Sequence, residues 1–429
     1  NTIFRNFIMN TMQQLPISNR WFVVFGAIII QLCLGAIYAW SVFTPSLVEA
    51  GWSKAQTQGV FSVGLLFFAL VMVLAGRILP ILGPKRVAFF GAIVLGLGYL
   101  GAGVFGGDSF LLLLFFIGMV GGSGIGLAYV VPIAVGMRWF PDKKGLITGL
   151  AVAGFGFGAT LWVKLAGSWG SLIATYGLNT TFAIYGIIFF IAISIGSIWM
   201  LFPPEGWKPE GYTPPTTRAD QSEKAEDYSS KEMLKTPQFY FLFITFAFGA
   251  SAGLMSIGLM KLFPMTALTA NGLSTAQASA IAGTAMAIFF SLANGIGRIV
   301  WGAISDKLGR KKSITIMMLT QGVFVIAFQW MAGTPMLLYL GATLIGFNFG
   351  GNFALFPTMT ADTWGTRYVG QNYGWVFLAY GFGGILGPIM GGYLGDMGNF
   401  PLAFTICGVL CLIAAGIIFS FKPPQHAKT

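Results

Sequence analysis

Charged residues are scarce in this sequence: Asp, Glu, Lys and Arg make up 9% of its 429 residues, whereas hydrophobic residues make up 56%. A water-soluble domain of this length carries far more charge on its surface. The composition therefore excludes a soluble globular protein. It predicts an all-α membrane protein that crosses the bilayer many times.

Residues that build catalytic and metal sites are also few. The single histidine, His426, lies in the C-terminal tail, and the three cysteines, Cys33, Cys407 and Cys411, lie in apolar runs. We find no nucleophile, metal-ligand cluster or pair of acids inside an apolar run, so we expect no enzyme activity and no cofactor or metal. The net charge of +11 follows from the positive-inside rule, and nucleic-acid binding is not expected.

Twelve apolar runs are long enough to cross a bilayer. They are expected at residues 21–44, 57–76, 87–106, 110–137, 146–168, 180–202, 239–263, 276–301, 313–332, 335–356, 370–392 and 402–421. The segment 203–236 between the two sets of six has seven acidic and five basic residues and no long apolar run. We therefore predict a six-helix bundle over 1–202, a cytoplasmic linker over 203–236 that is mobile or holds a short surface helix, and a second bundle over 237–429.

Lysine and arginine set the expected orientation. Most of them, with those of the linker, fall on one side of the membrane, whereas the other side has Lys54, Lys261 and, near the end of a span, Lys164. The positive-inside rule then places both termini in the cytoplasm. We expect the protein to lie in the inner membrane of the cell. We find no cleavable signal-peptide pattern and expect a monomer in the lipid bilayer.

The two halves repeat each other. Residues 75–86 match residues 301–312 at an offset of 226. At an offset of 225, Gly126, Pro132, Trp139, Gly145 and Gly149 match Gly351, Pro357, Trp364, Gly370 and Gly374. Two six-span halves in the same orientation indicate a parallel repeat with a central binding site.

Arg298 is a charged residue inside an apolar run. It lies well inside the apolar run 279–302, where a charge costs roughly 2.5–3.5 kcal/mol on insertion scales. Asn294 and Ser291 fall on the same helical face, and no acidic residue lies in an expected span, so the missing anion is a candidate substrate. The alternative is an arginine that extends toward the cytoplasmic surface and pairs with lipid phosphate or Asp306.

The loop after the second span of each half resembles the signature of the major facilitator superfamily. The second copy is nearly complete and the first has Pro80 where the acid belongs; the residues that carry the match are Gly302, Asp306, Lys307, Gly309, Arg310 and Lys311. Within that superfamily the chain resembles the oxalate/formate antiporters and the monocarboxylate transporters, including bacterial relatives of the lactate and pyruvate transporters. The segments that carry this resemblance are 19–22, 38–40, 138–146, 236–239, 294–298, 354–357 and 372–374.

The resemblance implies a set of binding residues. Arg298 matches the family's substrate arginine, and aromatic positions of the site match Tyr38, Tyr129, Phe349, Phe353 and Phe377. Two positions depart from the family. Tyr380 stands where the oxalate antiporter has a second cation, a lysine, and Asn294 stands where the animal monocarboxylate transporters have an aspartate.

These residues favour a small carboxylate as the substrate. A guanidinium offers a planar fork to both oxygens, and one arginine balances one carboxylate. We therefore expect alternating-access transport of short monocarboxylates such as lactate and pyruvate, with proton symport; the alternative is an anion exchanger of the oxalate/formate type. A solute-gated channel or sensor also remains open on composition alone.

Overall fold

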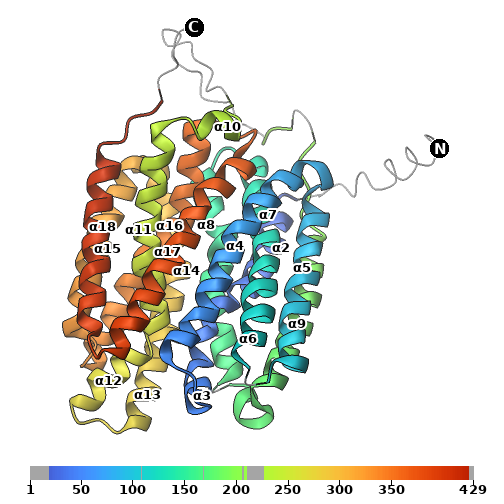
Figure 1. Cartoon of the computed structure of the whole chain (residues 1–429). Helices are drawn as coiled ribbons and strands as arrows, with labels where there is room; N and C mark the ends of the chain where they lie inside the picture. Colours follow the sequence, from blue (N-terminus) through green and yellow to red (C-terminus); the bar gives the residue numbers. More distant parts are fainter. Residues whose placement is uncertain (1–18, 108, 168, 205–206, 210–226, 425–429) are drawn as a thin grey trace.

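Two helical bundles lie side by side in the computed structural model, which describes residues 19–107, 109–167, 169–204, 207–209 and 227–424. The blue-to-green helices form one bundle and the yellow-to-red helices form the other (Figure 1). We call the described residues before 205 the N-terminal half and those after 226 the C-terminal half. The described residues contain helices and no strands, as expected in a bilayer, where backbone groups must bond within their own segment.

The N-terminal half follows the chain through six long helical spans. Its elements are α2 (Trp21–Leu34), η1 (Gly35–Val42), α3 (Thr44–Glu49), α4 (Lys54–Leu82), α5 (Pro84–Gly101), η2 (Ala102–Gly106), α6 (Phe110–Leu113), η3 (Leu114–Gly121), α7 (Gly122–Trp139), α8 (Lys144–Ala166) and α9 (Leu172–Ser197). The expected start of the sixth span near residue 180 agrees with a break inside α9 at Gly177, where φ is 77°.

The C-terminal half contains the remaining elements. They are α10 (Ser230–Met233), α11 (Pro237–Leu259), α12 (Leu262–Ala270), α13 (Thr275–Thr284), η4 (Ala285–Phe290), α14 (Ser291–Leu308), α15 (Arg310–Met331), α16 (Pro335–Trp364), α17 (Val369–Asp396) and α18 (Phe400–Phe419). Elements α13, η4 and α14 form one span, with the wider π-helical turns of η4 shortly before Arg298.

Eleven spans in the described chain are long and apolar enough to cross a membrane, and each corresponds to a run expected from the sequence. The twelfth expected run is α16, a continuous helix of 30 residues. It is less apolar than the others because it carries Asn348, Asn352 and several threonines on buried positions. Those side chains face protein and not lipid, so the helix needs less hydrophobicity than its neighbours.

Local sequence signals recur in both halves. Ser53 and Ser274 each form a capping box, with Gln56 and Gln277 respectively, at the start of a long span. Gly83 and Gly309 end α4 and α14 with φ of 79° and 88°, a conformation that glycine adopts without steric cost.

Glycines let the two halves approach closely at two equivalent crossings. A Cβ on Gly76 of α4 would overlap the carbonyl oxygen of Gly370 of α17, and one on Gly302 of α14 would overlap that of Gly145 of α8. The repeat found in the sequence relates the two pairs, because Gly76 corresponds to Gly302 and Gly145 corresponds to Gly370. The helices therefore pack backbone against backbone, as small residues permit within membranes.

The same glycine contacts identify the counterpart of Arg298. Gly149 packs on the carbonyl of Arg298, and its repeat partner Gly374 packs on the carbonyl of Met72. On the neighbouring helices, Gly126 of α7 contacts Met72 and Gly350 of α16 contacts Arg298. Gly126 and Gly350 are therefore equivalent, and the offset between α7 and α16 at this point is 224 residues instead of the 225 expected from the sequence. The N-terminal half thus has Met72 at the place where the C-terminal half has its arginine.

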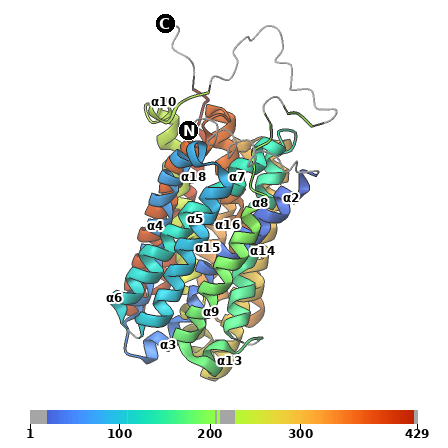
Figure 2. The ribbon, with the colours of Figure 1, turned by 90° about the vertical axis from the view of Figure 1, so that its right-hand side faces the viewer.

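The end of the molecule near α10 closes through polar contacts between the halves, opposite the end that holds α3 and α13 (Figures 1 and 2). Asp306 accepts from the backbone N–H groups of Gly145 and Leu146 at 3.2 and 3.1 Å, at the start of α8. Lys144 and Asp362 form an ion pair across the same boundary at 3.6 Å. An anion at a helix N-terminus is favourable, so these contacts hold that end shut.

The described end of the predicted linker packs on the C-terminal half. The Tyr228 N–H donates to the Trp364 carbonyl at 3.0 Å, and the Asn372 amide donates to the Tyr228 carbonyl at 2.9 Å. The short helix α10 follows, with Met233 buried. Residues 1–18 and 210–226, including much of the predicted linker, lie outside the described residues.

Candidate functional site

Arg298 is completely buried between the two halves. Its Nε donates to Asn294 Oδ1 at 2.9 Å, and its Nη1 donates to the carbonyl of Val152, in the other half, at 3.1 Å. Its Nη2 has no hydrogen-bond partner, and neither has Asn294 Nδ2. Since an unmade hydrogen bond in a buried charged group is costly, these two donors are ready for an acceptor.

Aromatic rings cover the guanidinium. Its Cζ lies 3.9 Å from the ring centre of Phe353 and 5.1 Å from that of Phe155. Cation–π contact stabilises a desolvated guanidinium without neutralising it, so it remains able to bind an anion. Phe155 was absent from the expected set. The offset of 225 maps it onto Tyr380, so the repeat carried the signal that would have identified it.

The close approach of α8 and α14 makes this arrangement possible. A Cβ on Gly156 would lie 2.8 Å from Asn294 Oδ1 and 2.5 Å from the backbone nitrogen of Gly295. A larger residue there would displace the amide that holds Arg298. The glycine therefore positions the site by leaving room for it.

A hydrogen bond joins the halves beside the arginine. The hydroxyls of Tyr38, on η1, and Tyr380, on α17, lie 2.9 Å apart, and both residues are buried. The Tyr380 ring stacks on Phe377 with centroids 4.7 Å apart, and Phe349 lies 6.0 Å from Tyr38. Tyr380 is thus engaged with another phenol.

Tyr129 completes the aromatic wall. Its ring lies 5.3 Å from Phe377 and 5.4 Å from Phe155, and its buried hydroxyl has no hydrogen-bond partner. Phe68, which the sequence did not suggest, lies 4.9 Å from Tyr129. All eight residues expected from sequence, namely Arg298, Asn294, Tyr38, Tyr129, Phe349, Phe353, Phe377 and Tyr380, surround one buried region.

The arginine has no protein counter-ion in the described chain, where it is the only charged side chain among the buried residues. Asp306, the candidate partner, instead pairs with Arg310 at 2.7 Å. Ser291, expected on the same face, donates to the carbonyl of Met286 and does not reach the guanidinium. Among the described residues the guanidinium is therefore hydrogen-bonded but not neutralised by a protein charge.

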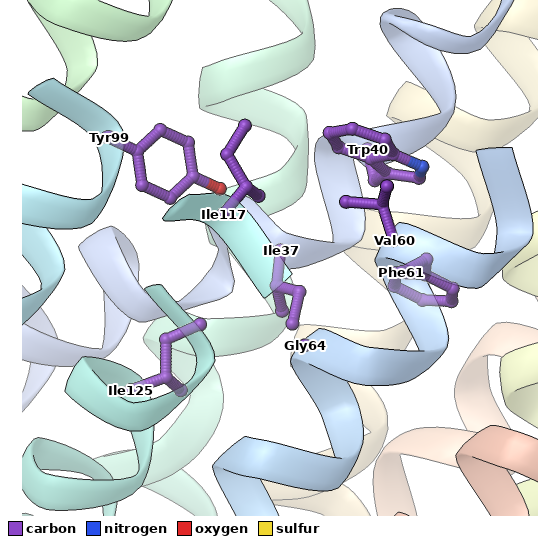
Figure 3. Close-up of a pocket in the computed structure, with 8 residues that line it drawn as sticks. All are labelled: Ile37, Trp40, Val60, Phe61, Gly64, Tyr99, Ile117 and Ile125. Atoms are coloured by element: carbon purple, nitrogen blue, oxygen red, sulfur yellow. The ribbon is translucent and has the colours of Figure 1, made fainter. Parts of the chain in front are cut away.

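A small pocket elsewhere has a different character. It lies within the N-terminal half and is lined by apolar side chains such as Ile37, Val60 and Ile117, with Trp40 and Tyr99 at its edge (Figure 3). None of the eight expected residues lines it. Without a charged group it offers nothing to an anion, so the candidate site remains the region around Arg298.

Comparison with known proteins gives one consistent result. The family model described as Major Facilitator Superfamily matches residues 20–290 and 253–429. The chain is 30% identical over 368 residues to the uncharacterized MFS-type transporter YhjX of Escherichia coli, covering 85% of this chain and 86% of that protein. It is 28% identical to the oxalate:formate antiporter of Oxalobacter formigenes, covering 96% and 93% of the two chains.

More distant matches agree. Monocarboxylate transporter 14 of Mus musculus is 23% identical, covering 94% of this chain and 90% of that protein. The solved structure of the proton:xylose symporter XylE superposes with a TM-score of 0.66 at 13% identity, covering 94% and 96% of the two chains. The last match shows the fold alone. The relatives named for an activity are transporters, and the resemblance found in the sequence is confirmed.

Proposed function

Because this chain belongs to the major facilitator superfamily, we propose that it is a secondary transporter of short monocarboxylates, such as lactate and pyruvate, that works by alternating access. The protein is an integral membrane protein. We further propose that it acts as a monomer in the inner membrane with both termini in the cytoplasm. The distribution of lysine and arginine in the sequence supports that orientation.

One observation carries the proposal: a buried guanidinium with one nitrogen unpartnered and no protein counter-ion among the described residues. A carboxylate offers two oxygens that accept from such a fork. Arg298 is already held by Asn294 and the Val152 carbonyl, so the site is preorganised and little side-chain freedom is lost on binding. The aromatic rings around it suit a short carbon chain.

The single cation supports a monocarboxylate over oxalate. A second carboxylate would lie among Tyr38, Tyr380 and Phe377, where the described chain supplies no second charge. An uncompensated charge in an apolar region costs several kcal/mol. The 28% identity to an oxalate:formate antiporter nevertheless keeps anion exchange as the second candidate mechanism.

We propose electroneutral symport, in which a proton offsets the charge of the anion. Asn294 does not titrate, and the described site holds no acid, so the proton travels with the substrate or uses a group away from Arg298. If instead the empty carrier with its lone buried charge reorients slowly, exchange of one anion for another dominates.

Transport into proteoliposomes tests both the proposed substrate class and the proposed coupling. Counterflow of labelled lactate against internal unlabelled lactate is expected of a carrier, and neither a pore nor an enzyme produces it. Vesicles without internal substrate then separate the mechanisms: an inward proton gradient accumulates lactate under symport. Uptake that needs internal carboxylate and ignores the gradient would support exchange and refute symport. No counterflow with any short monocarboxylate would refute the proposed substrate class.

A further inference from the structure

Tyr373 on α17 is a buried residue to which neither the sequence nor the site described above gives a role. Its side chain is fully buried and its hydroxyl has no hydrogen-bond partner. It lies on the stripe of α17 formed with Gly370, Phe377 and Tyr380, and each of these three contacts the N-terminal half. The residue therefore points its unpaired hydroxyl toward the boundary between the halves.

Its neighbours connect it to Arg298. The Tyr373 ring lies 5.6 Å from Phe377, which lies 5.3 Å from Tyr129. Tyr129 in turn lies 5.4 Å from Phe155, whose ring covers the Arg298 guanidinium at 5.1 Å. Tyr129 also has an unpaired hydroxyl, so two phenols and the unpaired donors of Arg298 and Asn294 surround the same buried region.

These four unpaired groups differ in chemistry. Arg298 Nη2 and Asn294 Nδ2 donate only, as a carboxylate requires. A phenol both donates and accepts, so it suits a neutral oxygen that is a carbonyl in one substrate and a hydroxyl in another. A buried hydroxyl left without a hydrogen bond is destabilising, and a substrate oxygen at that place would supply the missing bond.

We propose that Tyr373, together with Tyr129, is a specificity residue that binds an oxygen on the carbon next to the carboxylate. The inference rests on the proposed function and sharpens it: 2-hydroxy and 2-oxo monocarboxylates are preferred over unsubstituted ones of the same length. Arg298 and Asn294 bind the carboxylate shared by all of them. Tyr373 distinguishes among them.

Counterflow with paired substrates tests this. Lactate and pyruvate are compared with propionate, which has the same number of carbons and no oxygen at that position, in the wild-type protein and in Tyr373→Phe. We expect the substitution to raise the half-saturation concentration for lactate and pyruvate about 3- to 10-fold, the effect of one hydrogen bond, and that for propionate less than about 2-fold. Tyr185→Phe is the matched control, because its buried hydroxyl donates to the Trp162 carbonyl within the N-terminal half. It should change all three substrates equally or not at all.

The outcomes distinguish a failure of the Tyr373 proposal from a failure of the proposed function. Wild-type counterflow with an equal change for propionate and lactate in Tyr373→Phe would mean that the hydroxyl is structural, and would overturn the inference alone. Unchanged lactate affinity in a folded variant would do the same. A wild-type protein that carries no short monocarboxylate would refute the proposed function, and the inference with it.

Discussion

Replacing Arg298 with lysine keeps a positive charge at the centre of the molecule but removes the planar fork. In the wild-type protein Nε donates to Asn294 Oδ1 and Nη1 donates to the Val152 carbonyl, which leaves Nη2 without a partner, and the guanidinium lies 3.9 Å from the ring of Phe353. A lysine ammonium cannot make these contacts and bind both carboxylate oxygens at once.

The size of the effect follows from the bonds lost. A hydrogen bond to a charged group contributes about 1.5–3 kcal/mol, so losing one, with poorer orientation of the rest, should cost about 2–3 kcal/mol. That corresponds to a roughly 30- to 150-fold rise in the half-saturation concentration for lactate. Counterflow in proteoliposomes measures it, with the amount of folded protein checked by monodisperse elution and thermal unfolding.

Arg77→Lys serves as the control. Arg77 is exposed and lies 5.4 Å from the ring of Trp375, so lysine there keeps the charge and should leave lactate transport unchanged. Wild-type affinity for lactate in a folded Arg298→Lys protein would refute the assignment of this arginine as the anion ligand.

Three further predictions use the same preparations. Asn294→Ala should raise the half-saturation concentration for lactate roughly 5- to 30-fold, less than Arg298→Lys does. The carboxylate loses the Asn294 Nδ2 donor and the arginine loses one of its two hydrogen bonds, but the charge is kept; an effect equal to or larger than that of Arg298→Lys would contradict Arg298 as the principal anion ligand. Unlabelled oxalate should need at least about tenfold the concentration of unlabelled lactate to halve lactate counterflow, since Tyr380 supplies no charge; competition at equal concentration would show that another cation reaches the site. Gly76→Ala should destabilise the closed end near α10 by about 1–3 kcal/mol, seen as a lower Tm, because the new methyl overlaps the Gly370 carbonyl; Gly416→Ala, with open space around it, should not lower the Tm.

Much of the fold was accessible from the sequence because bilayer insertion leaves a strong signal. Long apolar runs mark the spans. The run expected at residues 335–356 is present as α16, even though the polar residues on its buried face lower its hydropathy. What hydropathy could not give was the backbone detail. No pattern of apolar residues encodes the π-helical turns of η4, whereas the break at Gly177 has a φ of 77° that glycine adopts without steric cost.

The central arginine was recognisable because a charge in an apolar run is costly enough to demand a reason. Its surroundings were less so. Phe68 is an ordinary residue of an apolar helix, and only the three-dimensional packing shows that it contacts Tyr129. Phe155 was marked in the sequence only by the repeat, which pairs it with Tyr380. Likewise nothing in the sequence separates the unpaired hydroxyl of Tyr373 from the paired one of Tyr380.

The presence of Met72 at the repeat position of Arg298 has a consequence for how such carriers diversify. The C-terminal half of the molecule supplies the buried charge of Arg298, and the N-terminal half supplies Phe68, Met72 and Tyr129, which are apolar or neutral. Changes in α4 and α7 can therefore alter the length and shape of an accepted acid while its required charge stays fixed. An acid with a second negative charge would need a second cation in the protein. Met72, the repeat counterpart of Arg298, is the position at which the N-terminal half would supply one.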